Sequence, residues 1–396
     1  MKKAFIFAAA AALALAACSK NDIIETINKV PEDTPIGFST YASKSVTKAD
    51  TDYYVNGTTQ TTLVSGKTFG VYAWSLTNTS TTPWTDGVKF TGSGNPTFMS
   101  NIPVTFNGST SGIEDSNSGA SNVSEAGYYS SGNPVRYWPS GDTPAGLSFF
   151  AYYPANATGL ERPVDGSSVE TGLGDYRFTT NSSAATQIDL MVSDVVADQY
   201  YGHTNSAYQS GTRGTVDLHF HHTLTKVQFK FKTDLEDSNT TLKLQEARLS
   251  DVYNINTLTV SYASASGETS YTWGTAENKT NYDITISGYK PSDSEPVTLS
   301  TTATTLTDAD AFLMVPQTIA ANQQEITLTW TVTTAGHTTT NTKTFDLNDI
   351  KNGSADINWG MNQQITYIIT ISPKAIYFTA SVDGWGSETT GTISVN

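Results

Sequence analysis

Apolar and polar residues alternate with a period of two along most of this chain, and no stretch shows the longer period of an amphipathic helix. In the stretch Phe-Gly-Val-Tyr-Ala-Trp, Phe69, Val71 and Ala73 share one face of a predicted strand. Tyr72 and Trp74 share the opposite face. The pattern therefore predicts β-structure here rather than helix.

Four later stretches show the same alternation. Their apolar positions are Leu147, Phe149, Ala151 and Tyr153; Ile326, Leu328, Trp330 and Val332; Ile365, Tyr367, Ile369 and Ile371; and Ile376, Phe378, Ala380 and Val382. In the second of these stretches, threonines fill the alternate positions, which is typical of a half-buried strand with a hydroxyl-bearing outer face.

The phase of the alternation changes at two places. Apolar positions 218 to 224 are even-numbered, whereas positions 227 to 231 are odd-numbered, so we expect a kink near Thr225. The phase changes again around Pro373, and there we expect a bulge or a break between two strands.

Many short strands with turn residues between them predict an all-β fold made of two β-sandwiches. The stretch 197–215 contains several glycines and is loop-like, so we place the boundary between the two domains there. The N-terminal domain then covers 36–212 and the C-terminal domain covers 213–396. Residues 107–133 are rich in Gly, Ser and Asn and predict a long surface loop.

The first residues predict an export signal rather than a folded element. Two lysines precede a short apolar run that is well below the ~20 residues needed to cross a bilayer. Leu-Ala-Ala-Cys at its end resembles a bacterial lipobox, which predicts a signal peptide over 1–17, cleavage between Ala17 and Cys18, and a lipid on Cys18. The alternative is an ordinary signal peptide cut after another alanine. Cys18 is the only cysteine in the chain, which favours the lipoprotein.

The polar residues 18–35 predict a tether between the lipid and the folded chain. A cysteine that carries several acyl chains gives stable attachment, so we expect an outer membrane lipoprotein. The residues after Cys18, Ser-Lys-Asn-Asp, resemble short signals that send some Bacteroidetes lipoproteins to the cell surface.

Composition agrees with an exported β-rich protein. The 396 residues are 37% apolar, 15% charged and 11% aromatic, so the charge density is low and aromatic residues are plentiful. Loss of Lys2 and Lys3 with the signal takes the formal charge from −15 to about −17. Such a charge argues against nucleic acid as a partner.

Candidate chemistry is sparse, and we expect no catalytic site, no metal and no cofactor. His219 and His221 share a strand face, whereas His222 faces the other way. A zinc site would need a third ligand, and no carboxylate lies at a telling offset, so structural hydrogen bonds are the favoured role. Trp84, Trp138 and Trp273 have the side chains to stack on sugars, although packing in the core or at its rim is the commoner role of tryptophan in a sandwich.

A series of motifs in a fixed order spans roughly 350 residues. They are Ile-Gly-Phe-Ser at 36–39, Phe-Gly-Val-Tyr-Ala-Trp at 69–74, Tyr-Trp-Pro at 137–139, 147–154, Asp-Leu-Met at 189–191, 218–229, Val-Pro-Gln at 315–317, Trp-Gly at 359–360 and Val-Asp-Gly-Trp at 382–385. The series resembles the fimbrillin family of Bacteroidales, whose members are lipoprotein precursors of type V pilus subunits.

The resemblance implies two tandem transthyretin-like β-sandwich domains and a first strand that a protease removes. Ile36, Phe38 and Thr40 would lie on that strand, and cleavage would fall between Lys48 and Ala49. The family's stalk members carry arginine where this chain has lysine, so a processed stalk, an uncleaved anchor and an accessory subunit remain alternatives.

The resemblance also implies that a strand from a neighbouring subunit fills the vacated groove. The C-terminal segment is our candidate donor, through Ile376, Phe378, Val382, Ile393 and Val395. The partners would then be other fimbrial subunits, with the outer membrane reached through the lipid. The alternative is a surface lipoprotein or pilus-tip adhesin that binds host glycans or proteins through aromatic loops and does not polymerise.

Overall fold

The computed structural model describes fourteen segments of the chain: residues 36–43, 53–56, 60–63, 67–76, 89–106, 136–139, 145–200, 215–237, 239–286, 291–292, 294–304, 310–352, 355–372 and 376–384. Several predicted features lie outside these residues, namely the signal peptide, Ala17, Cys18, the tether, Lys48, Ala49, Trp84, the loop 107–133, Ile393 and Val395.

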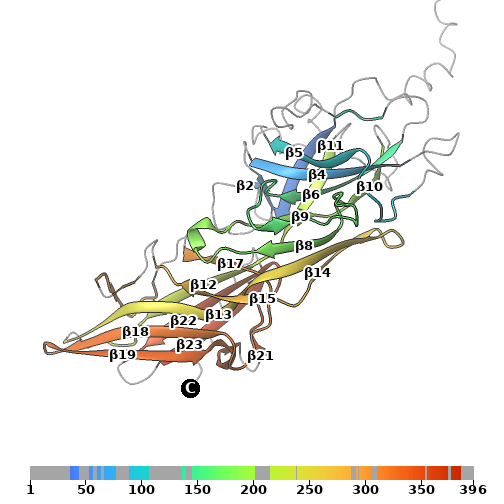
Figure 1. Ribbon diagram of the computed structural model, residues 1–396. Helices are drawn as coiled ribbons and strands as arrows, with labels where there is room; N and C mark the ends of the chain where they lie inside the picture. Colours follow the sequence, from blue (N-terminus) through green and yellow to red (C-terminus); the bar gives the residue numbers. More distant parts are fainter. Residues whose placement is uncertain are drawn as a thin grey trace, which may run out of the picture.

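The described secondary structure is almost entirely β-strand, which confirms the predicted all-β class (Figure 1). Short 3₁₀ turns lie at Ala184–Thr186 and Leu347–Asp349. Across the described residues, no helix has the length and apolarity that crossing a bilayer requires.

The first sheet has nine strands. Its order is β2 (Tyr53–Asn56), β3 (Gln60–Leu63), β1 (Gly37–Ser43), β11 (Thr215–His222), β9 (Met191–Ser193), β6 (Gly146–Tyr153), β4 (Lys67–Leu76) and β5 (Met99–Phe106), and β10 (Val196–Gln199) pairs with β6. These strands lie at the upper right of Figure 1.

Two further sheets face each other across a second core. An eight-stranded sheet has the order β19 (His337–Asp346), β18 (Glu325–Thr334), β13 (Thr240–Ala263), β8 (Gly174–Thr179) and β7 (Leu160–Glu161), with β14 (Glu268–Trp273), β15 (Glu277–Asp283) and β16 (Val297–Thr298) also paired to β13. A four-stranded sheet has the order β17 (Phe312–Met314), β12 (Thr225–Lys232), β22 (Gln363–Ile371) and β23 (Ile376–Gly384). A small hairpin joins β20 (Lys351–Asn352) to β21 (Ala355–Asp356).

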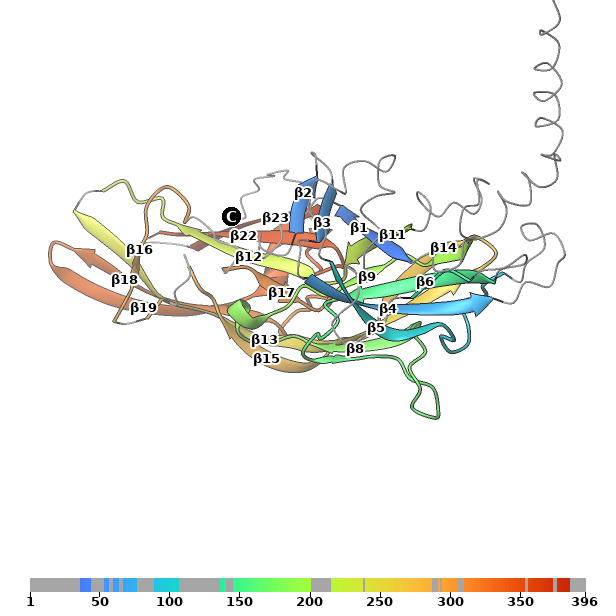
Figure 2. The ribbon, with the colours of Figure 1, turned by 90° about the horizontal axis from the view of Figure 1, so that it is seen from above.

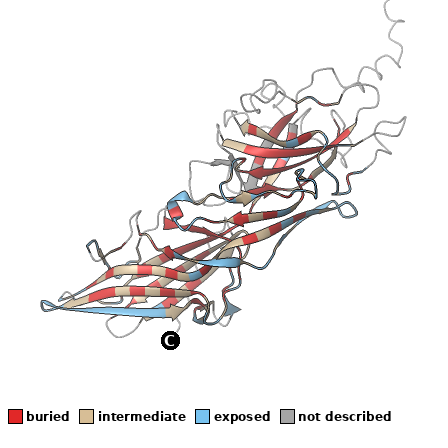
Figure 3. Ribbon diagram, in the orientation of Figure 1, coloured by how far each residue is buried: buried red, intermediate tan, exposed pale blue. Residues whose placement is uncertain are grey.

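The alternating residues of β4 are buried on both faces. Phe69, Val71 and Ala73 belong to one hydrophobic cluster, whereas Tyr72 and Trp74 belong to another. The six central residues of β4, 69–74, are all buried, whereas both ends of the strand are intermediate or exposed (Figure 3). The predicted faces are therefore confirmed, and each face of β4 packs into its own hydrophobic cluster.

Both phase changes mark structural breaks. The first lies between β11 and β12, which belong to different sheets and are separated by two residues, Thr223 and Leu224. Thr223 is held there because its backbone N–H and its hydroxyl both donate to the carbonyl of Leu190. The second lies between β22 and β23, which pair as an antiparallel hairpin that closes at Ile371 and Ile376.

One strand, β13, connects the two halves of the molecule. Its first part contributes Leu242 and Leu244 to the core between the eight- and four-stranded sheets. Its last part contributes Leu258 and Val260 to a cluster shared with the first sheet. In addition, β8 from the first half of the chain pairs with this last part of β13. The division at 212/213 remains a prediction. The chain leaves the nine-stranded sheet for the last time at residues 223–224, between β11 and β12, although β7 and β8 already belong to the eight-stranded sheet.

We predict that the two halves unfold in one transition because β13 carries residues of both cores. Leu258→Ala should lower the free energy of unfolding by about 2–5 kcal/mol, the usual range for a buried leucine. Circular dichroism and tryptophan fluorescence should report the same shifted midpoint. The exposed neighbour Ser261→Ala serves as the control and should leave the midpoint unchanged. Two separate transitions in the wild-type chain would contradict this prediction.

Candidate functional site

The predicted removable strand, β1, lies inside the first sheet between β11 and β3 (Figure 2). It runs parallel to β11, in register from Gly37 with Thr215 to Ala42 with Phe220. Its pairing with β3 covers two register pairs, at Ala42 and Ser43. Over the described residues, the ladder to β11 therefore supplies most of the backbone attachment of β1.

The alternating residues of β1 point into the core of the first sheet. Ile36, which directly precedes β1, and Phe38 and Thr40 within it are each at most 1% exposed. The ring of Phe38 meets the rings of Phe69 and Phe149 edge-on, with both centroid distances at 5.9 Å. The structure thus brings together the three residues that the sequence assigned to the removable strand.

Loss of β1 would uncover an apolar trough beside a strand edge. Phe69 and Phe149 would lose their contact with Phe38, and burial of a phenylalanine side chain is worth about 1.5–3 kcal/mol. The backbone of β11 would lose its parallel ladder partner. Unpaired edges of this kind bind an added strand through backbone hydrogen bonds and alternate side chains.

Thr40 places a polar hydroxyl in this apolar core. Its hydroxyl oxygen is buried, and the described residues offer it no hydrogen-bond partner. A buried polar group in that situation costs about 1–3 kcal/mol. An apolar side chain of similar shape would therefore fit the position better than the native threonine.

The described part of the predicted donor segment occupies its own sheet. β23 pairs with β22 through nine residues, from Ile371 with Ile376 to Gln363 with Gly384. Phe378 is 8% exposed and packs edge-on against Phe345 at a centroid distance of 4.8 Å. Ile376 and Val382 pack against the same core. Donation by these residues would require β23 to leave β22.

The two described tryptophans among the sugar-stacking candidates, Trp138 and Trp273, have different environments. Trp138 is 2% exposed and meets Phe149 edge-on at 5.8 Å, so it is a core residue rather than a surface aromatic. Trp273 is half-buried, and its indole N–H donates to the carbonyl of Thr223 at 2.9 Å. Of these two, only Trp273 retains surface that a ligand can reach.

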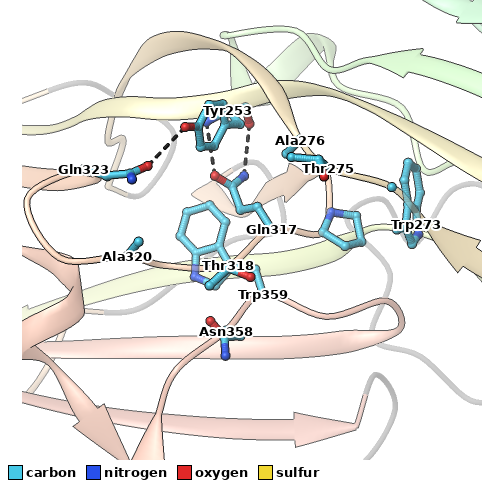
Figure 4. Close-up of a pocket in the computed structure, with 12 residues that line it drawn as sticks. Tyr253, Trp273, Thr275, Ala276, Gln317, Thr318, Ala320, Gln323, Asn358 and Trp359 are labelled. Atoms are coloured by element: carbon cyan, nitrogen blue, oxygen red, sulfur yellow. Dashed lines mark hydrogen bonds between the residues drawn. The ribbon is translucent and has the colours of Figure 1, made fainter.

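Trp273 lines a hollow of about 540 Å³ (Figure 4). The amide of Gln317 pairs with both backbone groups of Tyr253, through Tyr253 N–H to Oε1 at 3.1 Å and Nε2 to the Tyr253 carbonyl at 3.0 Å. The Tyr253 hydroxyl donates to Gln323 Oε1 at 3.1 Å. Because these polar groups bond to one another, the hollow does not by itself identify a ligand.

His219 and His221 converge on a carboxylate that the sequence did not single out. His219 Nδ1 and His221 Nε2 lie 3.0 Å and 2.9 Å from the same atom, Asp194 Oδ2. The Tyr271 hydroxyl donates to the other carboxylate oxygen at 2.7 Å. Burial alone would raise the pKa of Asp194, but the hydrogen bonds from these three side chains outweigh it and hold the pKa well below its usual range.

Asp194 could not be found from sequence spacing because it lies 25 and 27 residues before the two histidines. The antiparallel pairing of β9 with β11 brings them together, and the Asp194 N–H donates to the carbonyl of His219 at 2.8 Å. His222, on the opposite face, pairs instead with Asp189 at 2.9 Å.

Comparison with known proteins identifies the family. Residues 47–385 match the family model described as fimbrillin-like, so the chain belongs to the fimbrillin-like family. A comparison with curated proteins found no match.

Solved structures include similar folds. The crystal structure of a fimbrial protein from Bacteroides vulgatus has a TM-score of 0.51 and 21% identity over 80% of this chain and 92% of that one. A candidate cell adhesion protein from Bacteroides uniformis has a TM-score of 0.42 and 16% identity over 90% of this chain and 100% of that one. The similarity to the Bacteroides vulgatus structure supports the all-β fold described above.

The family is one of non-enzymatic fimbrial proteins. The match of residues 47–385 to this family supports the interpretation of the chain as a fimbrial subunit that associates with other subunits at the cell surface.

We predict that Thr40→Val raises the free energy of unfolding by about 1 kcal/mol because it removes a buried hydroxyl that lacks a partner. Chemical denaturation measures the change. Thr340→Val on the exposed strand β19 is the matched control and should change stability by less than about 0.5 kcal/mol. A destabilised Thr40→Val chain would show that the hydroxyl contributes a favourable bond.

Proposed function

We propose that this chain is a structural subunit of a surface fimbria, exported as a lipoprotein and assembled by strand exchange. One observation carries the proposal: β1 places Ile36, Phe38 and Thr40 in the core while it is attached mainly through one parallel ladder. A strand with these contacts stabilises the subunit before assembly, and its removal leaves a site shaped for another strand.

Two features favour replacement of β1. The buried Thr40 hydroxyl lacks a hydrogen-bond partner, which weakens the packing of β1 in the first sheet. Its ladder to β11 is parallel, and parallel pairing is slightly less stable per residue than antiparallel pairing. A donor that ran antiparallel to β11 and carried an apolar residue opposite the position of Thr40 would therefore bind more tightly than β1 does.

Cleavage behind β1 starts the exchange in this proposal. The cut falls between Lys48 and Ala49, in the sequence between β1 and the β2–β3 hairpin. After the cut, β1 is no longer covalently tied to the remainder of its sheet. Cys18 then acts as a delivery anchor: its lipid carries the subunit to the surface, and cleavage releases it. If Lys48 is not cut, Cys18 remains the anchor of a base subunit.

We assign the donor strand to the last part of the predicted segment. β23 already contributes Phe378 to its own core, so its withdrawal would expose that core. Ile393 and Val395 therefore remain the preferred donor residues, and Ile376, Phe378 and Val382 hold the segment in its own subunit. The two sandwich domains, over 36–212 and 213–396, remain the proposed organisation.

The alternative function is a glycan- or protein-binding adhesin that does not polymerise. The Trp273 hollow is the observation that favours it. Glycan binding that Trp273→Ala abolishes, in a chain that shows no self-assembly, would support the adhesin. Trp138→Ala is unsuitable for this test because Trp138 is in the core.

We predict that a chain beginning at Ala49 forms oligomers that can be seen by size-exclusion chromatography and electron microscopy. A synthetic peptide of residues 34–46 should suppress them because it refills the trough beside β11. Deletion of 385–396 should abolish assembly while the folded subunit persists, since β23 is retained.

A matched peptide with Phe38→Asp should not suppress assembly because its charge cannot enter the trough. A chain that stays monomeric, or oligomers that survive removal of all of 376–396, would contradict the proposal.

A further inference from the structure

The cluster of Asp194, His219 and His221 lies outside the strand-exchange site. His219 and His221 alternate on β11, so both imidazoles project from the same face, while Phe220 between them enters the core. Asp194 directly follows β9 and is fixed opposite them by its backbone bond to His219. Two adjacent strands thus hold three donor side chains in one place.

The distances between the donor atoms suit a small metal ion. Asp194 Oδ2, His219 Nδ1 and His221 Nε2 all lie within 4.8 Å of one another. Zinc binds nitrogen and oxygen ligands at about 2.0–2.2 Å, so donors in a tetrahedral site are about 3.3 Å apart. The two distances of 2.9 Å and 3.0 Å to Asp194 Oδ2 need little adjustment to reach that spacing.

Other groups hold the carboxylate in position. The hydroxyl of Tyr271 donates to Asp194 Oδ1, which leaves Oδ2 directed at the imidazoles. Tyr271 belongs to β14, and the same strand provides Thr269, whose hydroxyl accepts from the N–H of Val195 at 2.8 Å. Partners of this kind orient metal ligands and commonly change metal affinity by about 10–100-fold.

The cluster is also accessible. The side chains of His219, His221 and Asp194 are 29%, 24% and 39% exposed, so an ion can enter and a water molecule can complete its coordination. The negative charge of the whole chain favours the approach of a cation.

We propose that Asp194, His219 and His221 form a binding site for a divalent transition metal of the zinc class, with the fourth position open to solvent. Two imidazole nitrogens and one carboxylate oxygen are typical zinc ligands, whereas calcium and magnesium prefer oxygen ligands alone. A bound ion would join β9 to β11 and would strengthen the contact with β14. Because β11 is also the strand that pairs with β1, the ion would brace one wall of the first-strand trough.

The test titrates the full chain, freed of metal by a chelator, with Zn²⁺ by isothermal calorimetry. We expect one Zn²⁺ per chain with micromolar or tighter affinity, a higher unfolding temperature in Zn²⁺, and no competition from excess Mg²⁺. Co²⁺ should give the visible absorption of a four- or five-coordinate site.

His221→Gln should weaken Zn²⁺ binding at least tenfold, although its amide still offers Asp194 a hydrogen-bond donor. Tyr271→Phe should weaken binding about tenfold through Asp194. His337→Gln, on the exposed strand β19, is the matched control and should bind like the wild type. His203→Gln tests a histidine outside the described residues and should also leave binding unchanged. Unfolding temperatures measured with chelator present verify that each variant is folded.

Absence of saturable binding at micromolar Zn²⁺ would overturn the proposal. So would a His221→Gln chain that binds as tightly as the wild type, or loss of binding in His203→Gln instead. These outcomes test the metal site alone, because fimbrial assembly is measured separately by the oligomerisation of the chain that begins at Ala49.

Discussion

The parallel ladder between β1 and β11 is the contact on which the first sheet depends. It positions Phe38 between Phe69 and Phe149, and it separates β11 from the β2–β3 hairpin. The strand is part of the core, and the proposed cut between Lys48 and Ala49 would separate it from the strands that follow. In the proposed assembly, the subunit stays folded while β1 is in place and would acquire a binding site for another strand once β1 is removed.

The other half of the molecule packs against the first sheet. β13 runs from the second core into the cluster beneath the first sheet, and β8 pairs with its far end. β14, which pairs with the same strand, reaches Asp194 through Tyr271. These contacts hold β9, which lies on the other side of β11 from β1, so they would remain if β1 were removed.

Local sequence patterns predicted strands and faces well. The alternation at Phe69 to Trp74 gave both faces of β4, and the phase change near Thr225 marked the passage from one sheet to another. The pattern could not show which elements cover a face, so the core position of Trp138 was favoured only by the usual role of tryptophan in a sandwich. Pairings between distant strands were also invisible. Asp194 joins His219 and His221 only because β9 and β11 are neighbours, and β8 lies beside β13 although more than sixty residues separate them.

The most direct measurement of the strand-exchange account locks β1 in place. Ser39→Cys and Asp217→Cys substitute a register pair of the β1–β11 ladder, in a chain that starts at Ser19 so that Cys18 is absent, with a site for a sequence-specific protease at Lys48. After cleavage, light scattering should show that the disulfide-bonded chain stays monomeric and that a reducing agent starts polymerisation. Polymers that form while the disulfide is intact, or a reduced and cleaved chain that remains monomeric, would contradict the account.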